Sequence, residues 1–251
     1  MQLDLVGKAA LVTGSSRGIG RAIAEVLHAE GCRLAINGRT PETLATMASE
    51  LPGCIALNAD VTQPEQARRM IAEAVAALGG IDILVCNVGS GRSVPPGKET
   101  GEEWQRVFAQ NLWSTTNVIE AAREALAASK GAIVCVSSIC GLEVVPGAPV
   151  TYSAAKAALN AYVRGVARPM GKEGVRINAV APGNILFEDS VWSGRLCEDA
   201  GAVQEMLDRD VAMARLGTPQ DVADLVAYLV SPRAGFASGG VWALDGGQAH
   251  S

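Results

Sequence analysis

The chain is predicted to form a doubly wound α/β fold, a parallel sheet covered by helices on both faces. Short β-branched runs alternate with longer helical patterns from one end of the 251 residues to the other, which is the order typical of this fold. Candidate strands near residues 81–86 and 132–136 are almost continuously apolar, as strands buried on both faces are. Because no repeat, linker or composition shift divides the chain, we expect a single domain over residues 1–251.

The individual strands are predicted from short β-branched runs. We expect all of these runs to pair in one seven-stranded sheet. They lie at residues 8–13, 33–37, 54–58, 81–87, 132–137, 175–180 and 241–245.

Helices are predicted between these strands from apolar spacing and from capping residues. The first helix is predicted from the spacing i, i+4, i+7 and i+8 of Ile19, Ile23, Val26 and Leu27, with Gly31 as its C-terminal cap. Later starts are predicted at Thr40-Pro41 and Thr218-Pro219, and a capping box at residues 62–65. The Pro- and Gly-rich residues 94–97 are predicted to be a loop.

Charge and hydropathy exclude several classes of function. The 21 basic and 26 acidic residues give a net charge of −5, and no basic cluster denser than Arg68-Arg69 occurs, which argues against a nucleic-acid partner. No uncharged apolar run approaches the ~18–20 residues that span a bilayer. Asp4 stands where a signal peptide needs apolar residues. We therefore expect a cytoplasmic protein without a membrane partner.

Cysteine and histidine usage gives no indication of a metal site. The six cysteines contain no Cys-x-x-Cys pair and lie among apolar residues, so we expect them to be small buried hydrophobic residues. His28 and His250 have no second histidine or paired carboxylate at ligand spacing. We expect no bound metal.

A glycine-rich turn follows the first predicted strand and precedes the first helix. Residues 13–20, Thr-Gly-Ser-Ser-Arg-Gly-Ile-Gly, place glycines at a helix N-terminus, where free N–H groups and the helix dipole favour a phosphate. A simple tight turn is the alternative. The match to the Gly-x-Ser-x-Gly elbow of serine hydrolases is judged accidental, because the only distal histidine is His250. No Gly-Lys pair is followed by Ser or Thr, which excludes a P-loop.

The spacing Thr-Gly-x-x-x-Gly-Ile-Gly resembles the cofactor turn of the short-chain dehydrogenase/reductase family. The resemblance extends over nearly the whole chain, and its overall pattern is similar to that of 3-oxoacyl-acyl-carrier-protein reductases. It implies a Rossmann fold and a nicotinamide cofactor. The resemblance implies a set of cofactor-binding residues, to which we add Asn37 and Arg39 at the end of the second strand. The full set is Thr13, Gly14, Ser15, Ser16, Arg17, Gly18, Ile19, Gly20, Asn37, Arg39, Asp60, Val61, Asn87, Gly89, Tyr152, Lys156, Pro182, Gly183 and Ile185.

Tyr152 and Lys156 are four residues apart in a predicted helix over 151–170, so they share one face. A nearby ammonium group stabilises a phenolate, so Lys156 is expected to lower the pKa of Tyr152. The resemblance implies that Tyr152 exchanges a proton with the substrate oxygen, that Ser138 hydrogen-bonds that oxygen and that Lys156 holds the nicotinamide ribose. It also implies that Asn111 anchors a water. Ser137 is interpreted as a bystander.

Charge at the end of the second strand favours NADP(H) over NAD(H). An NAD site needs a carboxylate there to bind the ribose 2′-hydroxyl, but the segment reads Asn37-Gly38-Arg39-Thr40 and no acid occurs before Glu42. Arg39 and Arg17 could instead bind a 2′-phosphate. Each arginine could also be a solvated surface residue.

Two departures concern the later part of the chain. The family's usual Thr in Pro-Gly-x-x-x-Thr is Phe187 here, so Asn184 or the backbone from Ile185 onward would have to contact the nicotinamide. Residues 184–215 are predicted to be the least regular late segment and rich in apolar side chains. They form either a substrate lid or a surface packed on the domain or on another subunit, since family members commonly form tetramers. A homotetramer or homodimer is expected.

The sequence thus predicts an NADP(H)-dependent oxidoreductase that acts on a small-molecule ketone or secondary alcohol, with 3-oxoacyl thioesters as one substrate class by analogy. An NAD-dependent dehydrogenase of a sugar, a steroid or another secondary alcohol is the alternative. A non-catalytic dinucleotide-binding sensor or scaffold is a second one.

Overall fold

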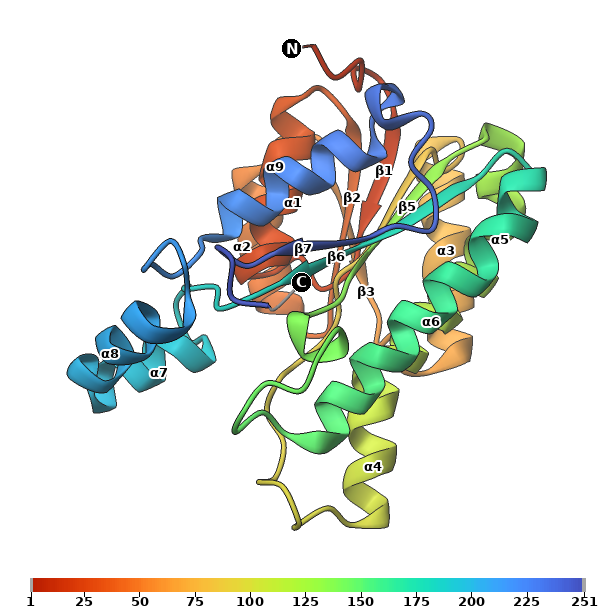
Figure 1. Ribbon diagram of the computed structural model, residues 1–251. Helices are drawn as coiled ribbons and strands as arrows, with labels where there is room; N and C mark the ends of the chain where they lie inside the picture. Colours follow the sequence, from red (N-terminus) through yellow and green to blue (C-terminus); the bar gives the residue numbers. More distant parts are fainter. Residues whose placement is uncertain (1, 250–251) are drawn as a thin grey trace.

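The computed structural model describes residues 2–249 and has a parallel seven-stranded sheet at its centre (Figure 1). The strand order is β3-β2-β1-β4-β5-β6-β7, with every neighbouring pair parallel. Each predicted strand is found, with ends within two residues of those expected. The strands are β1 (Ala9–Val12), β2 (Arg33–Gly38), β3 (Ile55–Asn58), β4 (Ile83–Cys86), β5 (Ala132–Val136), β6 (Arg176–Pro182) and β7 (Val241–Leu244).

The predicted doubly wound fold is confirmed by how the chain crosses the sheet. From β1 the chain moves outward to β2 and β3, and then returns to β4 on the other side of β1. At the carboxyl ends of β1 and β4, the connection after β1 and the connection after β4 therefore lead away in opposite directions. A ligand crevice is expected at such a point.

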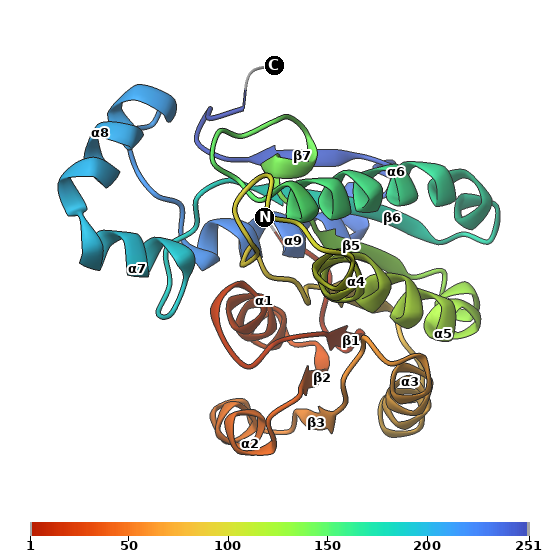
Figure 2. The ribbon, with the colours of Figure 1, turned by 90° about the horizontal axis from the view of Figure 1, so that it is seen from below.

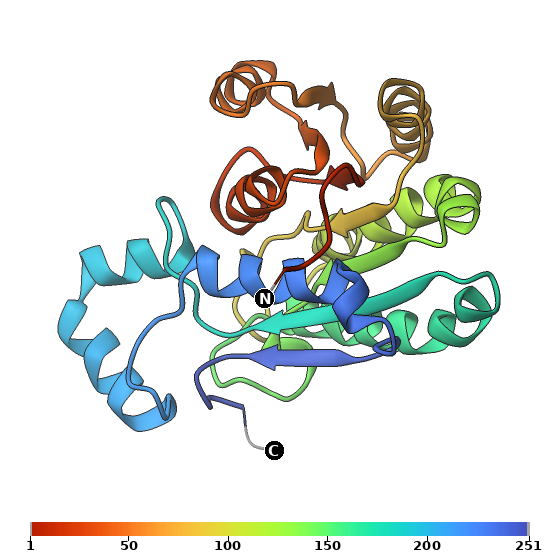
Figure 3. The ribbon, with the colours of Figure 1, turned by 90° about the horizontal axis from the view of Figure 1, so that it is seen from above.

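Helices cover both faces of the sheet (Figure 2). On one face, α1 (Gly18–Ala29) packs against α9 (Pro219–Val230), and α9 also lies over β5 and β6, as the view in Figure 3 shows. On the other face, α3 (Pro64–Leu78) packs against α5 (Ser114–Ser129), and α6 (Val150–Lys172) lies against β6. Outside residues 184–215, the remaining helical segments are α2 (Pro41–Glu50), α4 (Gly101–Phe108), η1 (Ala109–Trp113), η2 (Ile139–Gly141) and η3 (Pro232–Ala234).

Alternate residues of each central strand enter two separate cores. On β4, Ile83 and Val85 pack with α1 and α9, whereas Leu84 and Cys86 pack with α3 and α5. All four side chains are buried. This burial on both faces explains why the strand is apolar without alternation.

The predicted helix ends agree with the structure at α1 and α9. Ile23 and Leu27 are fully buried, and Gly31 has φ +82° just after the C-cap of α1. Thr218 caps α9 with a capping box in which its side chain and that of Asp221 bond each other's backbone N–H.

The start predicted at Thr40-Pro41 is confirmed, because Thr40 is the N-cap residue of α2 and Pro41 is its first residue, although the Thr40 side chain makes no capping hydrogen bond. One predicted cap is wrong. The capping box at residues 62–65 does not form, because α3 begins at Pro64 with Gln63 as its N-cap. The hydroxyl of Thr62 instead donates to Asp60 Oδ1 at 2.8 Å, a closer partner than the helix N-terminus.

Residues 184–215 are more regular than the sequence predicted. They contain α7 (Val191–Glu198) and α8 (Ala200–Asp210), which lie apart from the two helical layers, at one side of the sheet (Figure 1). Val203, Leu207 and Val211 form a small core of their own. The apolar residues that suggested a lid are therefore partly used in packing these helices together.

The cysteines are less uniform than expected. Cys32, Cys86 and Cys135 are buried, and Cys54 and Cys140 are partly buried. Cys197 on α7 is exposed, so the expectation of burial is wrong for Cys197. No helix among residues 2–249 is long and apolar enough to cross a membrane. His250 lies outside the described residues.

The fold predicts which core substitution is costly. Leu84 is fully buried between β1 and β5, so Leu84→Ala should lower the free energy of unfolding by about 2–5 kcal/mol in urea denaturation. Val144→Ala is the control, because Val144 is 92% exposed, and should change it by less than about 0.5 kcal/mol. Equal effects of the two substitutions would contradict this packing.

Candidate functional site

A cleft of about 740 Å³ runs along the carboxyl edge of the sheet. It is lined by the turn after β1, the ends of β2, β4, β5 and β6, and residues of α6 and α7. Most of the predicted site residues meet in it, but Thr13, Ser15, Gly18 and Asn111 are not among its lining residues. A smaller cavity of about 190 Å³ lies beside the ends of β6 and β7, where Asn184 and Ile185 border both.

The glycine turn is held against β4 by Asn87. Its Nδ2 donates to the carbonyl oxygens of Thr13 at 3.1 Å and Gly14 at 2.9 Å, and its backbone N–H donates to Thr13 Oγ1 at 3.0 Å. A Cβ at Gly20 would lie 2.3 Å from the Gly14 carbonyl oxygen. Only glycine at position 20 therefore allows α1 to start so close to the turn.

Ser15 and Asn37 shape the turn from inside. The hydroxyl of Ser15 donates to the Val12 carbonyl at 3.1 Å. The Asn37 amide donates to the carbonyls of Leu57 at 3.0 Å and Ala59 at 3.1 Å, and its oxygen accepts from Gly14 N at 3.4 Å. Both residues are buried. Their side-chain hydrogen bonds hold the turn in place, and Asn37 also lines the cleft.

Ser16, Arg17, Gly38 and Arg39 line the cleft at the end of β2. Arg17 is the N-cap residue of α1, and its side chain lies 4.0 Å from Asp189 in an exposed ion pair. Arg39 is exposed. Two guanidinium groups and a helix N-terminus make this end of the cleft attractive to an anion.

Helix α6 places Tyr152 and Lys156 together, as the spacing predicted. Lys156 is buried, donates to the Val136 carbonyl at 2.8 Å and lies 5.9 Å from the centre of the Tyr152 ring. Ser138 follows β5 in extended backbone at the start of η2, and its oxygen accepts from Cys140 N at 3.2 Å. The three side chains line one part of the cleft.

Burial dominates the pKa values of the Tyr–Lys pair. It raises the pKa of Tyr152 to about 12, against a hydrogen bond with Ser138 that lowers it. It lowers the pKa of Lys156 to about 8. The expected lowering of the Tyr152 pKa by Lys156 is therefore wrong for the protein alone, because desolvation of the phenolate is the larger effect.

Asn111 lies beside Lys156 in η1, a single π-helical turn between α4 and α5. Such turns often mark functional sites. Asn111 is fully buried, donates to the Val107 carbonyl at 3.0 Å and accepts from Ser90 N at 2.9 Å. A Cβ at Gly89 would lie 2.9 Å from Asn111 Oδ1 and 3.0 Å from Lys156 Nζ. Glycine at position 89 therefore allows the two side chains to approach.

Ser137 differs from Ser138 in its partner. Its hydroxyl donates to Asn160 Oδ1 at 2.6 Å in a buried contact. This hydrogen bond supports the interpretation of Ser137 as a structural residue.

Phe187 lies over the glycine turn. A Cβ at Gly18 would come within 2.6 Å of the Phe187 ring. The Asn184 side chain faces α8, with Nδ2 3.7 Å from Met206 Sδ. Asn184 and Ile185 both line the cleft, together with Pro182 and Gly183, so both predicted replacements for the family's threonine border it.

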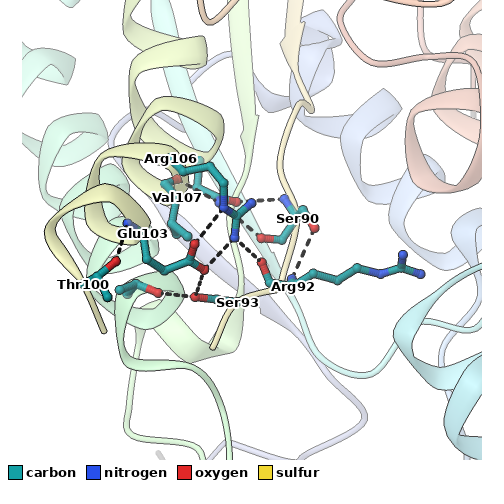
Figure 4. Close-up of polar contacts among 9 residues, drawn as sticks. Ser90, Arg92, Ser93, Thr100, Glu103, Arg106 and Val107 are labelled. Carbon is teal, nitrogen blue, oxygen red and sulfur yellow. Dashed lines mark hydrogen bonds and ion pairs between the residues drawn. The ribbon is translucent and has the colours of Figure 1, made fainter. Parts of the chain in front are cut away.

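A polar network beside the site was missed by sequence reasoning (Figure 4). Ser93 donates to Glu103 Oε1 at 2.7 Å and shares a hydrogen bond of 2.6 Å with Thr151, the residue before Tyr152. Arg106 donates to both Glu103 oxygens, at 2.6 and 2.8 Å. Hydrogen bonds from Arg106 and Ser93 lower the pKa of Glu103 to about 2.

The available signal for this network was the i, i+3 pair of Glu103 and Arg106 in a helix capped by Thr100. No sequence pattern connects that pair to the loop after β4. Cys140, Trp192 and Arg195 were also missed as lining residues. Within residues 2–249, no group of three or more His, Cys, Asp or Glu side chains is placed to hold a metal ion.

A strand-turn-helix cleft with a tyrosine, a lysine and a serine at its centre defines a dinucleotide-type oxidoreductase site. Residues 14–249 match the model of the enoyl-(acyl carrier protein) reductase family. The chain belongs to the short-chain dehydrogenase/reductases and is similar to 3-oxoacyl-acyl-carrier-protein reductases. It is an oxidoreductase of the kind that acts on C=O and CH–OH groups.

Relatives and solved structures agree with this assignment. The chain is 34% identical to the 3-oxoacyl-acyl-carrier-protein reductases FabG of Chlamydia muridarum, over 251 residues, and of Escherichia coli, over 250, with 98% of each chain covered. L-sorbose reductase from Gluconobacter frateurii, solved with NADPH and L-sorbose, superposes with a TM-score of 0.93 at 28% identity, covering 100% of both chains.

Close packing at Gly20 predicts a specific cost for a methyl group. Gly20→Ala should push the turn away from Asn87 and lower the free energy of unfolding by about 1–3 kcal/mol in urea denaturation. Gly165→Ala is the matched control in α6, where a Cβ meets nothing within 4 Å. It should leave stability unchanged or raise it by up to about 1 kcal/mol. A stable Gly20→Ala variant would show that the turn tolerates displacement.

Proposed function

We propose that the protein catalyses hydride transfer between NADP(H) and a ketone or secondary alcohol, with 3-oxoacyl thioesters as the substrate class. This proposal rests on one observation: Ser138, Tyr152 and Lys156 line the same cleft as the glycine turn. Similarity to FabG enzymes supports the thioester class. The alternative alcohols, sugars and steroids remain competing substrates, and L-sorbose in a structural neighbour favours testing sugars.

The residues present fit a dinucleotide. The start of α1 offers the backbone N–H groups of Gly18 and Ile19 to a pyrophosphate, and Gly14 at φ +62° and Gly18 at φ +55° add no side chain of their own to the turn. Asp60 and Val61 line the region next to β3, and Asn87 and Gly89 line the path to Lys156. When bound, the nicotinamide supplies or accepts the hydride.

NADP(H) rather than NAD(H) is proposed from the charge at the end of β2. Gly38 and Arg39 line the cleft where an NAD site needs a carboxylate. Arg39 and Arg17 can donate charge-assisted hydrogen bonds to a 2′-phosphate. Two structural neighbours bear NADPH, L-sorbose reductase and a blue fluorescent protein from a metagenomic library.

In this mechanism Tyr152 acts as the general acid for carbonyl reduction. With a pKa of about 12 its phenol keeps its proton at neutral pH, ready to donate it to the substrate oxygen. Ser138 hydrogen-bonds that oxygen and stabilises its developing charge. Lys156, protonated below a pH of about 8, binds the ribose and supports reprotonation of Tyr152, with Asn111 positioned to anchor a water behind it.

Residues 184–215 act in this proposal as a substrate lid on a single domain. Phe187 and Asp189 already contact the glycine turn through Gly18 and Arg17. Closure would exclude water from the reaction. A homo-oligomer, a tetramer or a dimer, is proposed because Trp242 and Ala243 of the edge strand β7 are exposed.

Tyr152→Phe tests whether the cleft is catalytic. Loss of the acid should lower kcat for ketone reduction by about 10²–10⁴-fold, measured as NADPH oxidation, with the Kd for NADPH unchanged within about threefold by fluorescence titration. Tyr228→Phe, at a partly exposed position on α9, is the control and should retain full activity. Full turnover by Tyr152→Phe would contradict the role of Tyr152 as the acid, whereas NADPH binding without any turnover by the unmodified protein would favour the sensor or scaffold alternative.

Arg39→Ala tests the cofactor preference. Removal of the guanidinium should raise the Kd for NADPH about tenfold or more, because a charge-assisted hydrogen bond to phosphate is lost. The Kd for NADH should change far less. Arg69→Ala, which removes an exposed arginine of α3 outside the cleft, should affect neither. Tighter binding of NADH than NADPH by the unmodified protein would reverse the assignment.

A further inference from the structure

The cleft is basic although the chain is acidic. With a net charge of −5, the protein nevertheless lines the cleft with five cationic and two acidic side chains. The cations are Arg17, Arg39, Arg92, Lys156 and Arg195, and the acids are Asp60 and Asp189. Arg17 and Arg39 lie by the glycine turn, and Lys156 beside Tyr152. Arg92 and Arg195 have no role in the proposed hydride transfer.

Arg92 directly follows Gly91, a residue that lies beside the Tyr152 ring. A Cβ at Gly91 would lie 3.8 Å from the Tyr152 ring, so the loop after β4 passes directly beside the catalytic side chain. Arg195 comes from another segment, α7, and its guanidinium stacks 4.8 Å from the centre of the Trp192 ring. Trp192 also lines the cleft. The two arginines therefore border the part of the cleft between Tyr152 and α7.

The backbone of Arg92 is fixed on one side by the polar network of α4. Arg106 donates to the Arg92 carbonyl at 3.0 Å, and the Arg92 N–H donates to Ser90 Oγ at 3.2 Å. Figure 4 shows the Arg92 side chain extending away from this network. Its guanidinium donates to the Asp189 carbonyl at 3.0 Å, which places it next to residues 184–215. Arg92 thus bridges the catalytic loop and the proposed lid.

Neither arginine is neutralised by the protein. Among residues 2–249 no carboxylate lies within 4 Å of the guanidinium of Arg92 or Arg195, whereas Arg106 is paired with Glu103 and Arg17 with Asp189. A planar guanidinium group with free N–H donors binds carboxylates and phosphates in preference to other groups. Two such groups beside a carbonyl-reducing centre favour a substrate that carries its own anion.

We propose that Arg92 and Arg195 bind an anionic group, a carboxylate or a phosphate ester, on the part of the substrate remote from its reacting carbonyl. This inference rests on the proposed reductase function and deepens it, since it identifies the substrates as anionic ketones. Contact of the anion with Arg92 and with Arg195 of α7 also links substrate binding to the position of residues 184–215.

Matched substrate pairs test the proposal on the full-length protein with NADPH. One pair is acetoacetyl-phosphopantetheine and acetoacetyl-pantetheine, which differ only in a phosphate. The other is 5-oxohexanoate and methyl 5-oxohexanoate, which differ in a carboxylate charge. We expect kcat/KM to be about tenfold higher for at least one anionic member than for its neutral partner, mainly because KM is lower. At high salt, the kcat/KM of the anionic member should fall toward that of its neutral partner.

Arginine variants then assign the preference to these residues. Arg92→Ala and Arg195→Ala should each lower the anionic-to-neutral ratio of kcat/KM about tenfold. Arg92→Lys should restore part of the ratio, because the charge remains without the planar fork. Arg69→Ala is the matched control and should leave the ratio unchanged. Circular dichroism and urea denaturation confirm that each variant is folded.

The outcomes separate this inference from the proposed function. Preference in the phosphate pair alone identifies a phosphate ester, and preference in the carboxylate pair alone identifies a keto acid. Reduction of the neutral ketones without any anion preference, or a ratio unchanged in both alanine variants, overturns the inference and leaves the reductase function standing. Absence of reduction of every substrate overturns both.

Discussion

The site depends on the close approach of the first helix to the turn after β1. Two hydrogen bonds from the Asn87 amide fix the carbonyls of Thr13 and Gly14, and the absence of a side chain at Gly20 lets α1 start against them. The same asparagine begins the loop that continues through Gly89 toward Lys156 and Asn111. One asparagine therefore connects the anion-attracting end of α1 with the loop that leads to Lys156 of α6.

A second constraint acts through the loop after β4. Its Ser93 is hydrogen-bonded to Glu103 of α4 and to Thr151 of α6, so this loop, α4 and the residue before Tyr152 are held as one unit. Asn111 adds a further contact by accepting from Ser90. Tyr152 is thus supported by its own helix and by the neighbouring loop, which favours a fixed position of its phenol.

The sheet and the Tyr–Lys pair could be predicted because both follow from local patterns. Strands such as β4 and β5 are apolar on both faces, and the four-residue spacing of Tyr152 and Lys156 fixes them on one side of a helix. Contacts between distant segments determine the hydrogen bonds of the Asn37 side chain, the pKa of Tyr152 and the network around Glu103. Such contacts leave no regular spacing in the chain. The two helices of residues 184–215 were missed because their short apolar stripes pack on each other.

The uneven burial of the cysteines gives the molecule a chemical handle. Burial raises the pKa of the thiols of Cys32, Cys54 and Cys140, which slows their reaction as thiolates. Cys197, by contrast, is exposed on α7, the helix that carries Arg195. A maleimide dye will therefore attach first to that helix, and its emission can report how the helix responds to added ligands without any engineered attachment point.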